Sequence, residues 1–380
     1  MKLKLFSTIL IVIILLSSCI SCYTKTPVRE EKEADVSLKT TQTEIEETER
    51  PDVSLKYSVP YNENLFTISC MSCLTYSDEE FLSYWENQSG KEREEFKKIY
   101  PEFFEFFNNP LRKKIKEDLN KIDPKIIEKI KSDPTLKTFN SFWIRLGLMD
   151  DTIKLSKDEF LNKYELIREF YEEAEIHNLY LIYEDDYEKE LEKYRKILPE
   201  KIKAVRDYLR LEEPEENEII YVPNFIDINF RGFNSRGLDK IYIYTWFDPY
   251  YIALTHEYIH PVIEPLFSTY ENYKLFNKYK ELMKLVRDKD IDTSYNTWTS
   301  IVNESLVQSI AFRILFSNDE EKLNFQIGGN EKLGLILVRH FNEKLKEYEK
   351  KDIKFKDFLP EMLSTIDIEK EKEEFIRDNK

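Results

Sequence analysis

Apolar and aromatic residues recur every three or four positions through most of residues 77–213. This spacing places them on one face of an α-helix, whereas the charged residues between them face solvent. Capping boxes, which are typical of helix N-termini, occur twice in this part, at Ser77–Glu80 and at Ser156–Glu159. The pattern therefore predicts a long, mainly helical part whose aromatic stripes pack helices together.

The pattern changes to short strand-like runs in the next part of the chain. The apolar run Ile219–Val222 predicts a strand that ends at Pro223. Residues 240–247 predict a second strand, because β-branched and aromatic residues alternate there. A loop with Gly232 and Gly237 is expected between the two strands. The expected fold class is α+β and predominantly helical, with a small β-sheet that precedes another helix.

The N-terminal residues have the features of an export signal. Lys2 and Lys4 precede an apolar run of about 12 residues, fewer than the roughly 20 that a membrane-spanning helix needs. Leu16–Cys19 resembles the lipobox of bacterial lipoproteins, in which the cysteine becomes the lipidated first residue; an ordinary cleaved signal is the alternative. We expect residues 1–18 to be removed and Cys19 to anchor the protein outside the cytoplasm. No aspartate follows this cysteine, which favours the outer membrane in a cell that has one.

Composition separates a tether from the folded part. Residues 19–56 are rich in Thr, Glu, Lys and Ser, and such a segment buries too little apolar surface to offset its ordering entropy. We therefore expect a disordered acidic tether there. The rest divides into a helical part, 57–217, and a part with strands, 218–366, which are expected to form one unit. A charged tail, 367–380, follows.

The composition of the whole chain limits its function. The chain has 380 residues, 14% of them aromatic, and a net charge of −16. A chain of this length can bury a sizeable core, but its negative charge disfavours nucleic acid, because a phosphate backbone is bound by basic surfaces. Cys70 and Cys73 stand in an apolar stretch, and we expect core cysteines or an intrahelical disulfide rather than a redox site.

The chain has only four histidines, and two of them form a pattern. Asp248 and Pro249 have the character of an N-cap and a first helical residue, and the helix predicted after them contains an HExxH motif. Residues i and i+4 share a helix face, so His256 and His260 can both reach one zinc ion at roughly 2.0–2.1 Å. Glu257 can then take a proton from a metal-bound water.

A catalytic zinc site needs a third protein ligand. Glu264 is too far from the first histidine, about 12 Å along a straight helix, and Pro261 disfavours helical geometry just before it. Glu304 is the single carboxylate on the mostly apolar helix predicted at residues 298–312. A buried carboxylate needs a partner, and zinc would provide one. Glu304 is therefore the expected third ligand, and Gln308 on the same face is expected to support a ligand.

At these residues the sequence resembles the gluzincin branch of zinc metallopeptidases, which have an HExxH helix and a glutamate ligand on a later helix. It looks most like a group of uncharacterised bacterial secreted or lipoprotein zincin-like proteins. These carry an Asn-Glu-x-x-Val-x-x-x-Ala-x-Arg stretch, here Asn303–Arg313. The specific resemblance covers about residues 239–313. It departs at Gln308, because thermolysin-like enzymes have a histidine-orienting aspartate there.

The resemblance implies a zincin-like catalytic unit that hydrolyses peptide bonds in a peptide or protein substrate. Substrates of zincins typically pair with the edge strand before the active-site helix, and residues 241–247 are the matching element. Zincins also use a further side chain to bind the oxyanion. Tyr295 and His340 are both candidates for that role. Arg313 is a third, ranked last because it lies about 180° around its helix from Glu304.

The alternative function is that of a non-catalytic surface lipoprotein with a zincin fold. Such a pseudopeptidase or binding module would keep the fold without the reaction. The intact Glu257 favours the enzyme, because a degenerate site need not retain its base.

Overall fold

The computed structural model describes the chain in several stretches. These are residues 55–75, 110–133, 165–212, 217–226, 232–237, 239–246, 251–267 and 297–378, with isolated residues at 93–109 and 272–282. The predicted signal, Cys19, nearly all of the tether, both capping boxes, Asp248, Pro249 and Tyr295 lie outside these residues.

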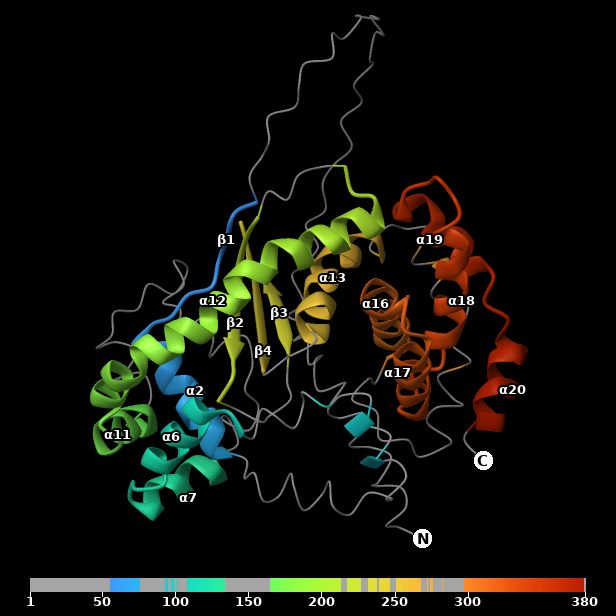
Figure 1. Ribbon diagram of the computed structural model, residues 1–380. Coiled ribbons are helices and arrows are strands. Elements are labelled where there is room, and N and C mark those ends of the chain that lie inside the picture. Colours follow the sequence, from blue (N-terminus) through green and yellow to red (C-terminus); the bar gives the residue numbers. More distant parts are fainter. Residues whose placement is uncertain are drawn as a thin grey trace, which may run out of the picture.

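The chain forms many helices around one small sheet (Figure 1). The helices of the first half are α2 (Glu63–Thr75), α6 (Pro110–Leu119), α7 (Pro124–Ser132), α11 (Glu165–Glu173) and α12 (Ile176–Leu209). Those of the second half are α13 (Ile252–Phe267), α16 (Trp298–Phe316), α17 (Glu320–Lys332), α18 (Val338–Tyr348), α19 (Phe355–Ser364) and α20 (Ile368–Asp378). The fold is therefore α+β and predominantly helical, as the hydrophobic pattern predicts.

Four strands form a mixed sheet in the order β1-β2-β4-β3. The strands are β1 (Tyr57–Ser58), β2 (Glu218–Asn224), β3 (Phe233–Arg236) and β4 (Lys240–Trp246). The first three in this order are parallel, and β3 is antiparallel to β4. Because β4 pairs with a strand on each side, the expectation that residues 241–247 offer a free edge is wrong. Among the described strands, the edge on that side is β3.

β3 occupies the segment that we expected to be a loop. Its sequence, Phe-Asn-Ser-Arg, has little strand propensity. Beyond its end, the Gly237 amide donates to the Lys240 carbonyl of β4 at 2.7 Å. Pairing with β4 thus makes this segment a strand, although its own composition does not.

Pro223 lies within β2 and does not end it. The Ile219 amide donates to the Lys56 carbonyl on the β1 side, and alternate amides of a strand point to the same side. An amide hydrogen at position 223 would thus also point to that side. β1 ends at Ser58, which pairs with Ile220. The proline therefore removes no ladder hydrogen bond.

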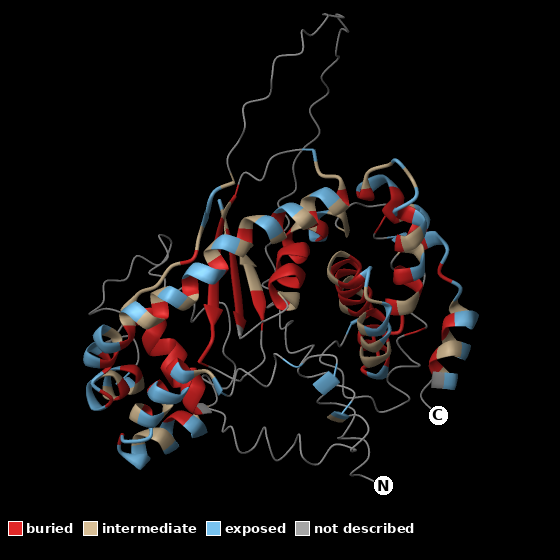
Figure 2. Ribbon diagram, viewed as in Figure 1, coloured by how far each residue is buried: buried red, intermediate tan, exposed pale blue. Residues whose placement is uncertain are grey.

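The long helix α12 contacts elements of both halves of the chain, including α2, α6, α13 and α16. Its buried residues follow one another at intervals of three or four: Leu179, Tyr183, Tyr187, Leu191, Tyr194, Leu198, Ile202, Val205 and Leu209. Figure 2 shows the exposed residues along its outer side and a largely buried sheet, α13 and α16 beneath. The described apolar core is one cluster, which extends from Val59 to Phe375.

α13 begins later and ends later than expected. Tyr251 has a positive φ of 58°, so the helix begins at Ile252 rather than directly after Pro249. It continues through Pro261 and Pro265. The Pro261 carbonyl cannot accept the usual helical hydrogen bond, because Pro265 has no amide hydrogen. Arg236 Nη1 instead donates to this carbonyl at 3.3 Å.

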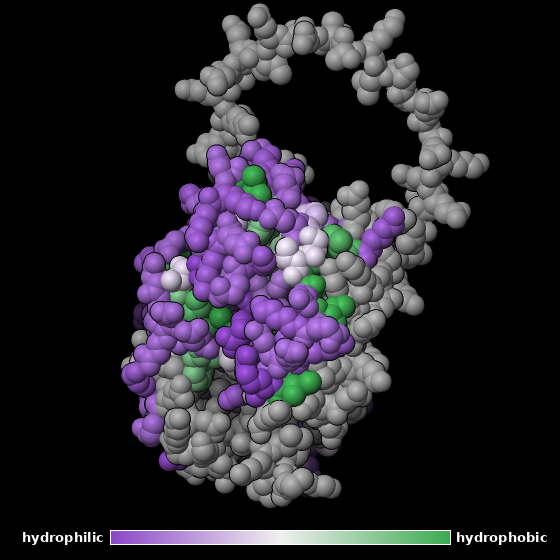
Figure 3. Space-filling model, turned by 90° about the vertical axis from the view of Figure 1, so that its right-hand side faces the viewer, coloured by the Kyte–Doolittle hydropathy of each residue, from purple (hydrophilic) through white to green (hydrophobic). Residues whose placement is uncertain are grey.

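Three further expectations concern the rest of the described chain. Cys70 and Cys73 are buried thiols in α2, so the disulfide alternative is not formed. The segment expected to be a charged tail contains α20, whose Glu371 and Phe375 are buried. Where α18, α19 and α20 face the viewer, the visible described surface is mainly hydrophilic (Figure 3). No helix among the described residues is long and apolar enough to span a membrane.

Candidate metal centre

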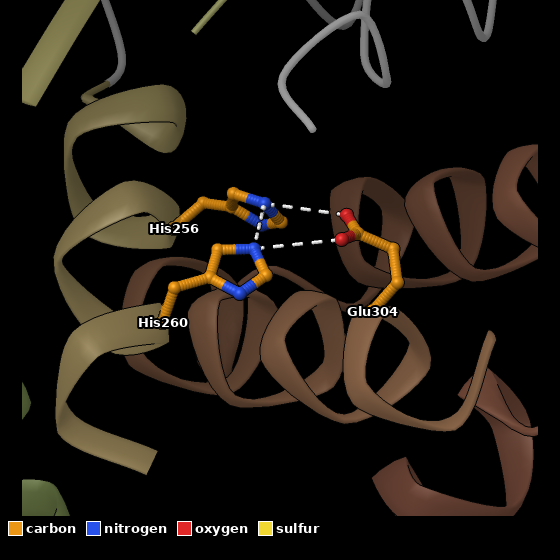
Figure 4. A group of neighbouring side chains, drawn as sticks. All are labelled: His256, His260 and Glu304. Carbon is orange, nitrogen blue, oxygen red and sulfur yellow. Dashed lines mark hydrogen bonds and ion pairs between the residues drawn. The ribbon is translucent and has the colours of Figure 1, made fainter. Parts of the chain in front are cut away.

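α13 carries both histidines of the HExxH motif into the interior. This helix contacts β3, β4, α12 and α16, so that every residue from Ala253 to Pro261 is buried. His256 and His260 lie one turn apart on the face that points to α16 (Figure 4). Their Nε2 atoms are 3.0 Å apart. The local i, i+4 spacing therefore brings two imidazole nitrogens together, as the motif predicts.

Glu304 reaches the two histidines from α16. Its side chain is buried, with Oε1 3.2 Å from His256 Nε2 and Oε2 3.4 Å from His260 Nε2 (Figure 4). One ligand atom from each of these residues lies within 4.8 Å of the others. Such a buried group of two imidazoles and one carboxylate could hold a metal ion. Helix packing thus brings the expected third ligand to the expected place.

Burial sets the protonation of His256. It lowers the pKa of His256 to about 3, although the nearby Glu304 carboxylate acts in the opposite direction. His256 is therefore neutral at neutral pH. A neutral imidazole offers a nitrogen lone pair, which is the form that a metal ion requires.

Glu257 points to β3 instead of joining the three donors. Asn234 Nδ2 donates a hydrogen bond to its Oε2 at 2.7 Å. Oε1 is buried and has no hydrogen-bond partner in the described structure. Burial raises the pKa of Glu257 well above its usual range, and the Asn234 hydrogen bond opposes this rise. A carboxylate of this kind can accept a proton from a water molecule beside it.

A glycine makes room for this carboxylate. A Cβ atom at Gly232 would lie 2.8 Å from Glu257 Oε1, closer than real contacts allow. Sequence reasoning missed both Asn234 and the use of Gly232. Nothing local in the sequence relates them to Glu257, because the contact depends on packing of β3 against α13.

Two polar side chains surround the donors. Gln308 Nε2 donates to Glu304 Oε1 at 3.1 Å, in agreement with its expected supporting role. Glu264 is not one of the three donors, but its Oε1 lies 3.8 Å from His260 Nδ1. Metal-ligating histidines are commonly oriented by a carboxylate on their second ring nitrogen, and Glu264 stands on that side.

The structure does not bring His340 to the donor group. Its Nδ1 lies 3.4 Å from Glu371 Oε1 of α20, and its Nε2 lies 3.4 Å from the Met362 carbonyl of α19. Arg313 of α16 is also occupied elsewhere, because its Nε donates to Glu349 at 2.7 Å. His340 therefore lacks the position needed for the oxyanion role. The second candidate, Tyr295, lies outside the described residues.

Comparisons with known proteins identify a family for this chain. No curated protein matches the sequence, and no solved structure matches it. A family model described as Domain of unknown function (DUF4932) matches residues 135–365, a region that includes α13, α16 and the three donor residues. Because the match covers more than half of the chain, the protein belongs to this DUF4932 family.

Proposed function

We propose that the protein is a zinc metallopeptidase of the gluzincin type, with a zincin-like catalytic unit. The observation that carries this proposal is the buried convergence of His256, His260 and Glu304, with the buried Glu257 next to His256 on the same helix. Two histidines and one glutamate are a ligand set of catalytic zinc sites, which leave a further position open.

The spacing of the donor atoms fits this ion. A tetrahedral zinc site with ligands at about 2.0–2.1 Å has donor atoms roughly 3.3 Å apart. The two Nε2 atoms are 3.0 Å apart; His256 Nε2 lies 3.2 Å from Glu304 Oε1, and His260 Nε2 lies 3.4 Å from Glu304 Oε2. The three residues thus support a single zinc ion as the cofactor.

In this proposal the residues of the chain have separate roles. His256, His260 and Glu304 hold the ion, which when bound would polarise the scissile carbonyl and acidify a water molecule. Glu257 accepts the proton of that water and later passes it to the leaving amine. The edge strand β3, rather than β4, receives the peptide substrate by strand addition, because its far side pairs with no strand in the described part.

The proposed setting is the bacterial cell envelope. The lipobox-like Leu16–Cys19 supports a protein tethered through lipidated Cys19, outside the cytoplasm and facing peptides or envelope proteins. The net charge of −16 is in keeping with a substrate other than nucleic acid.

Zinc content and peptide cleavage test this function together. We expect wild type and Glu257→Gln each to bind one zinc per chain. Glu257→Gln should lower cleavage of a peptide library by at least about 100-fold, because it removes the general base. Glu304→Ala should lose the zinc. Glu320→Gln, an exposed substitution on α17, is the matched control and should change neither property.

The outcomes separate the enzyme from its alternative. A wild-type protein that binds zinc but cleaves no library peptide would favour the non-catalytic zincin-fold lipoprotein. Full zinc content in Glu304→Ala would show that Glu304 is not the third ligand.

A further inference from the structure

The side chains of β3 alternate between the two faces of the sheet. Phe233 stacks on Tyr244 of β4, with ring centroids 4.9 Å apart. Asn234 and Arg236 lie on the opposite face, where they donate to Glu257 Oε2 and to the Pro261 carbonyl. One face of β3 thus contacts α13 at two residues about one helical turn apart, Glu257 and Pro261. Asn234 is the residue that contacts the proposed base, Glu257.

The backbone of Asn234 points to the open edge of the sheet. The Gly237 amide donates to the Lys240 carbonyl, so these two opposed residues form a hydrogen-bonded pair. Such pairs alternate with non-bonded pairs along an antiparallel ladder. Asn234 and Ile243 form the opposed pair three positions along the ladder from Gly237 and Lys240. Because the two kinds of pair alternate, an odd number of positions makes this a non-bonded pair. The amide and carbonyl of Asn234 thus face away from β4.

The neighbours of Glu257 hold it in one orientation. Asn234 engages Oε2, while the missing side chain of Gly232 leaves space at Oε1. A lysine or arginine beside a carboxylate would neutralise its charge. A neutral amide can donate a hydrogen bond to the carboxylate and leave that charge in place. It also adds no carboxylate that would compete for a metal ion. Asn234 is thus suited to orient Glu257 without placing a further charge beside it.

We propose that Asn234 is a positioning residue, whose side chain orients Glu257 while its own backbone presents the open edge of β3 to a peptide. A docked peptide would then lie next to a base that is already oriented. The inference rests on the proposed peptidase function, but its structural part does not depend on activity. Gly232 supports the same orientation, because it makes room for Oε1 of the Glu257 carboxylate.

Asn234→Leu tests this role, since leucine keeps the volume and removes the donor. In the zinc-loaded full chain we expect kcat to fall at least about 10-fold, because small displacements of a catalytic group have large effects on rate. KM should stay within about twofold and zinc at one per chain, because the peptide-binding backbone and the ligands remain. Gly232→Ala should act in the same direction. Glu320→Gln, the exposed substitution on α17, is the control and should leave kcat unchanged.

Crystal structures of the variants test the same role without an assay. Glu257 should leave its orientation in Asn234→Leu and should keep it in Glu320→Gln. Asn234→Ala, which should show the same change, serves if the leucine variant does not fold. An unmoved Glu257 in the Asn234 variants would overturn the proposal. So would wild-type kcat in these variants if Glu257→Gln abolishes cleavage. If wild type cleaves nothing, the proposed function fails, and the orientation of Glu257 alone decides whether Asn234 positions it.

Discussion

Glu304 and Glu257 are both buried carboxylates, yet their neighbours give them different chemistry. Glu304 faces the two histidine Nε2 atoms, so it can complete a metal site. Glu257 has one amide donor on Oε2 and no hydrogen-bond partner on Oε1 among the described residues, so it keeps a free basic oxygen. The role of each residue therefore depends on the few atoms within hydrogen-bond distance of it.

Gln308 provides a prediction at this scale. It donates to Glu304 Oε1, and removal of such a supporting hydrogen bond typically weakens metal binding about 10- to 100-fold. We expect Gln308→Ala to show this loss of zinc affinity in a competition titration with a chromogenic chelator. Asn303→Ala, which removes the amide next to Glu304 on the same helix, should keep wild-type affinity. Equal affinity in all three proteins would remove Gln308 from the site.

Single residues were predicted well where a local spacing determined them. The i, i+4 histidines follow from helix geometry alone, and Glu304 could be selected because it is the single carboxylate on an apolar helix. Asn234 could not be selected, because it lies 23 residues before Glu257 on a different element. His340 shows the converse: its place on a helix near the site did not reveal that its ring contacts α19 and α20.

At the scale of elements, α13 shows how packing overrides a local rule. Pro261 was expected to disrupt the helix, yet α13 passes through both of its prolines. A proline inside a helix removes one hydrogen bond, and its ring crowds the carbonyl four residues before it. Here Arg236 of the neighbouring strand donates to the carbonyl that Pro265 leaves without a helical partner. The missing hydrogen bond of α13 is therefore replaced by one from β3, a strand that the sequence pattern did not predict.

This interaction can be tested by chemical denaturation. Arg236→Ala should lower the free energy of unfolding by about 1 kcal/mol, because it removes a hydrogen bond from a helix carbonyl. The same substitution should cost less in a Pro265→Ala background, where residue 265 can donate to the Pro261 carbonyl. An equal loss in both backgrounds would mean that Arg236 stabilises the protein through a different contact.

At the scale of the whole molecule, the donor group joins two helices that are far apart in the sequence. His256 and His260 belong to α13, whereas Glu304 belongs to α16. Both helices contact α12, which also packs against α2 and α6 of the first half. A bound ion would therefore stabilise a contact at the centre of the molecule.

Metal removal should accordingly lower the thermal stability of the whole protein. With zinc at about 1,000 times its dissociation constant, binding adds about 4 kcal/mol to the free energy of unfolding. For a chain of this size that corresponds to a Tm increase of roughly 5 °C. We expect calorimetry to show that the Tm falls by this amount when zinc is removed by a chelator. The Tm should recover when zinc is restored. Glu304→Ala should be insensitive to the chelator; an equal Tm decrease in this variant would place the stabilising metal elsewhere.

The sequence by itself determined the features that depend on near neighbours in the chain. These are the helical stripes, the strands around residues 219–222 and 241–246, and the pair of histidines, because each follows from a repeat of two or from the 3.6 residues of a helical turn. Tertiary structure alone decided that β3 is a strand and lies at the edge, that α13 continues past its prolines, and that Asn234 holds Glu257. The physical reason is that each of these depends on hydrogen bonds between elements, which no local spacing encodes.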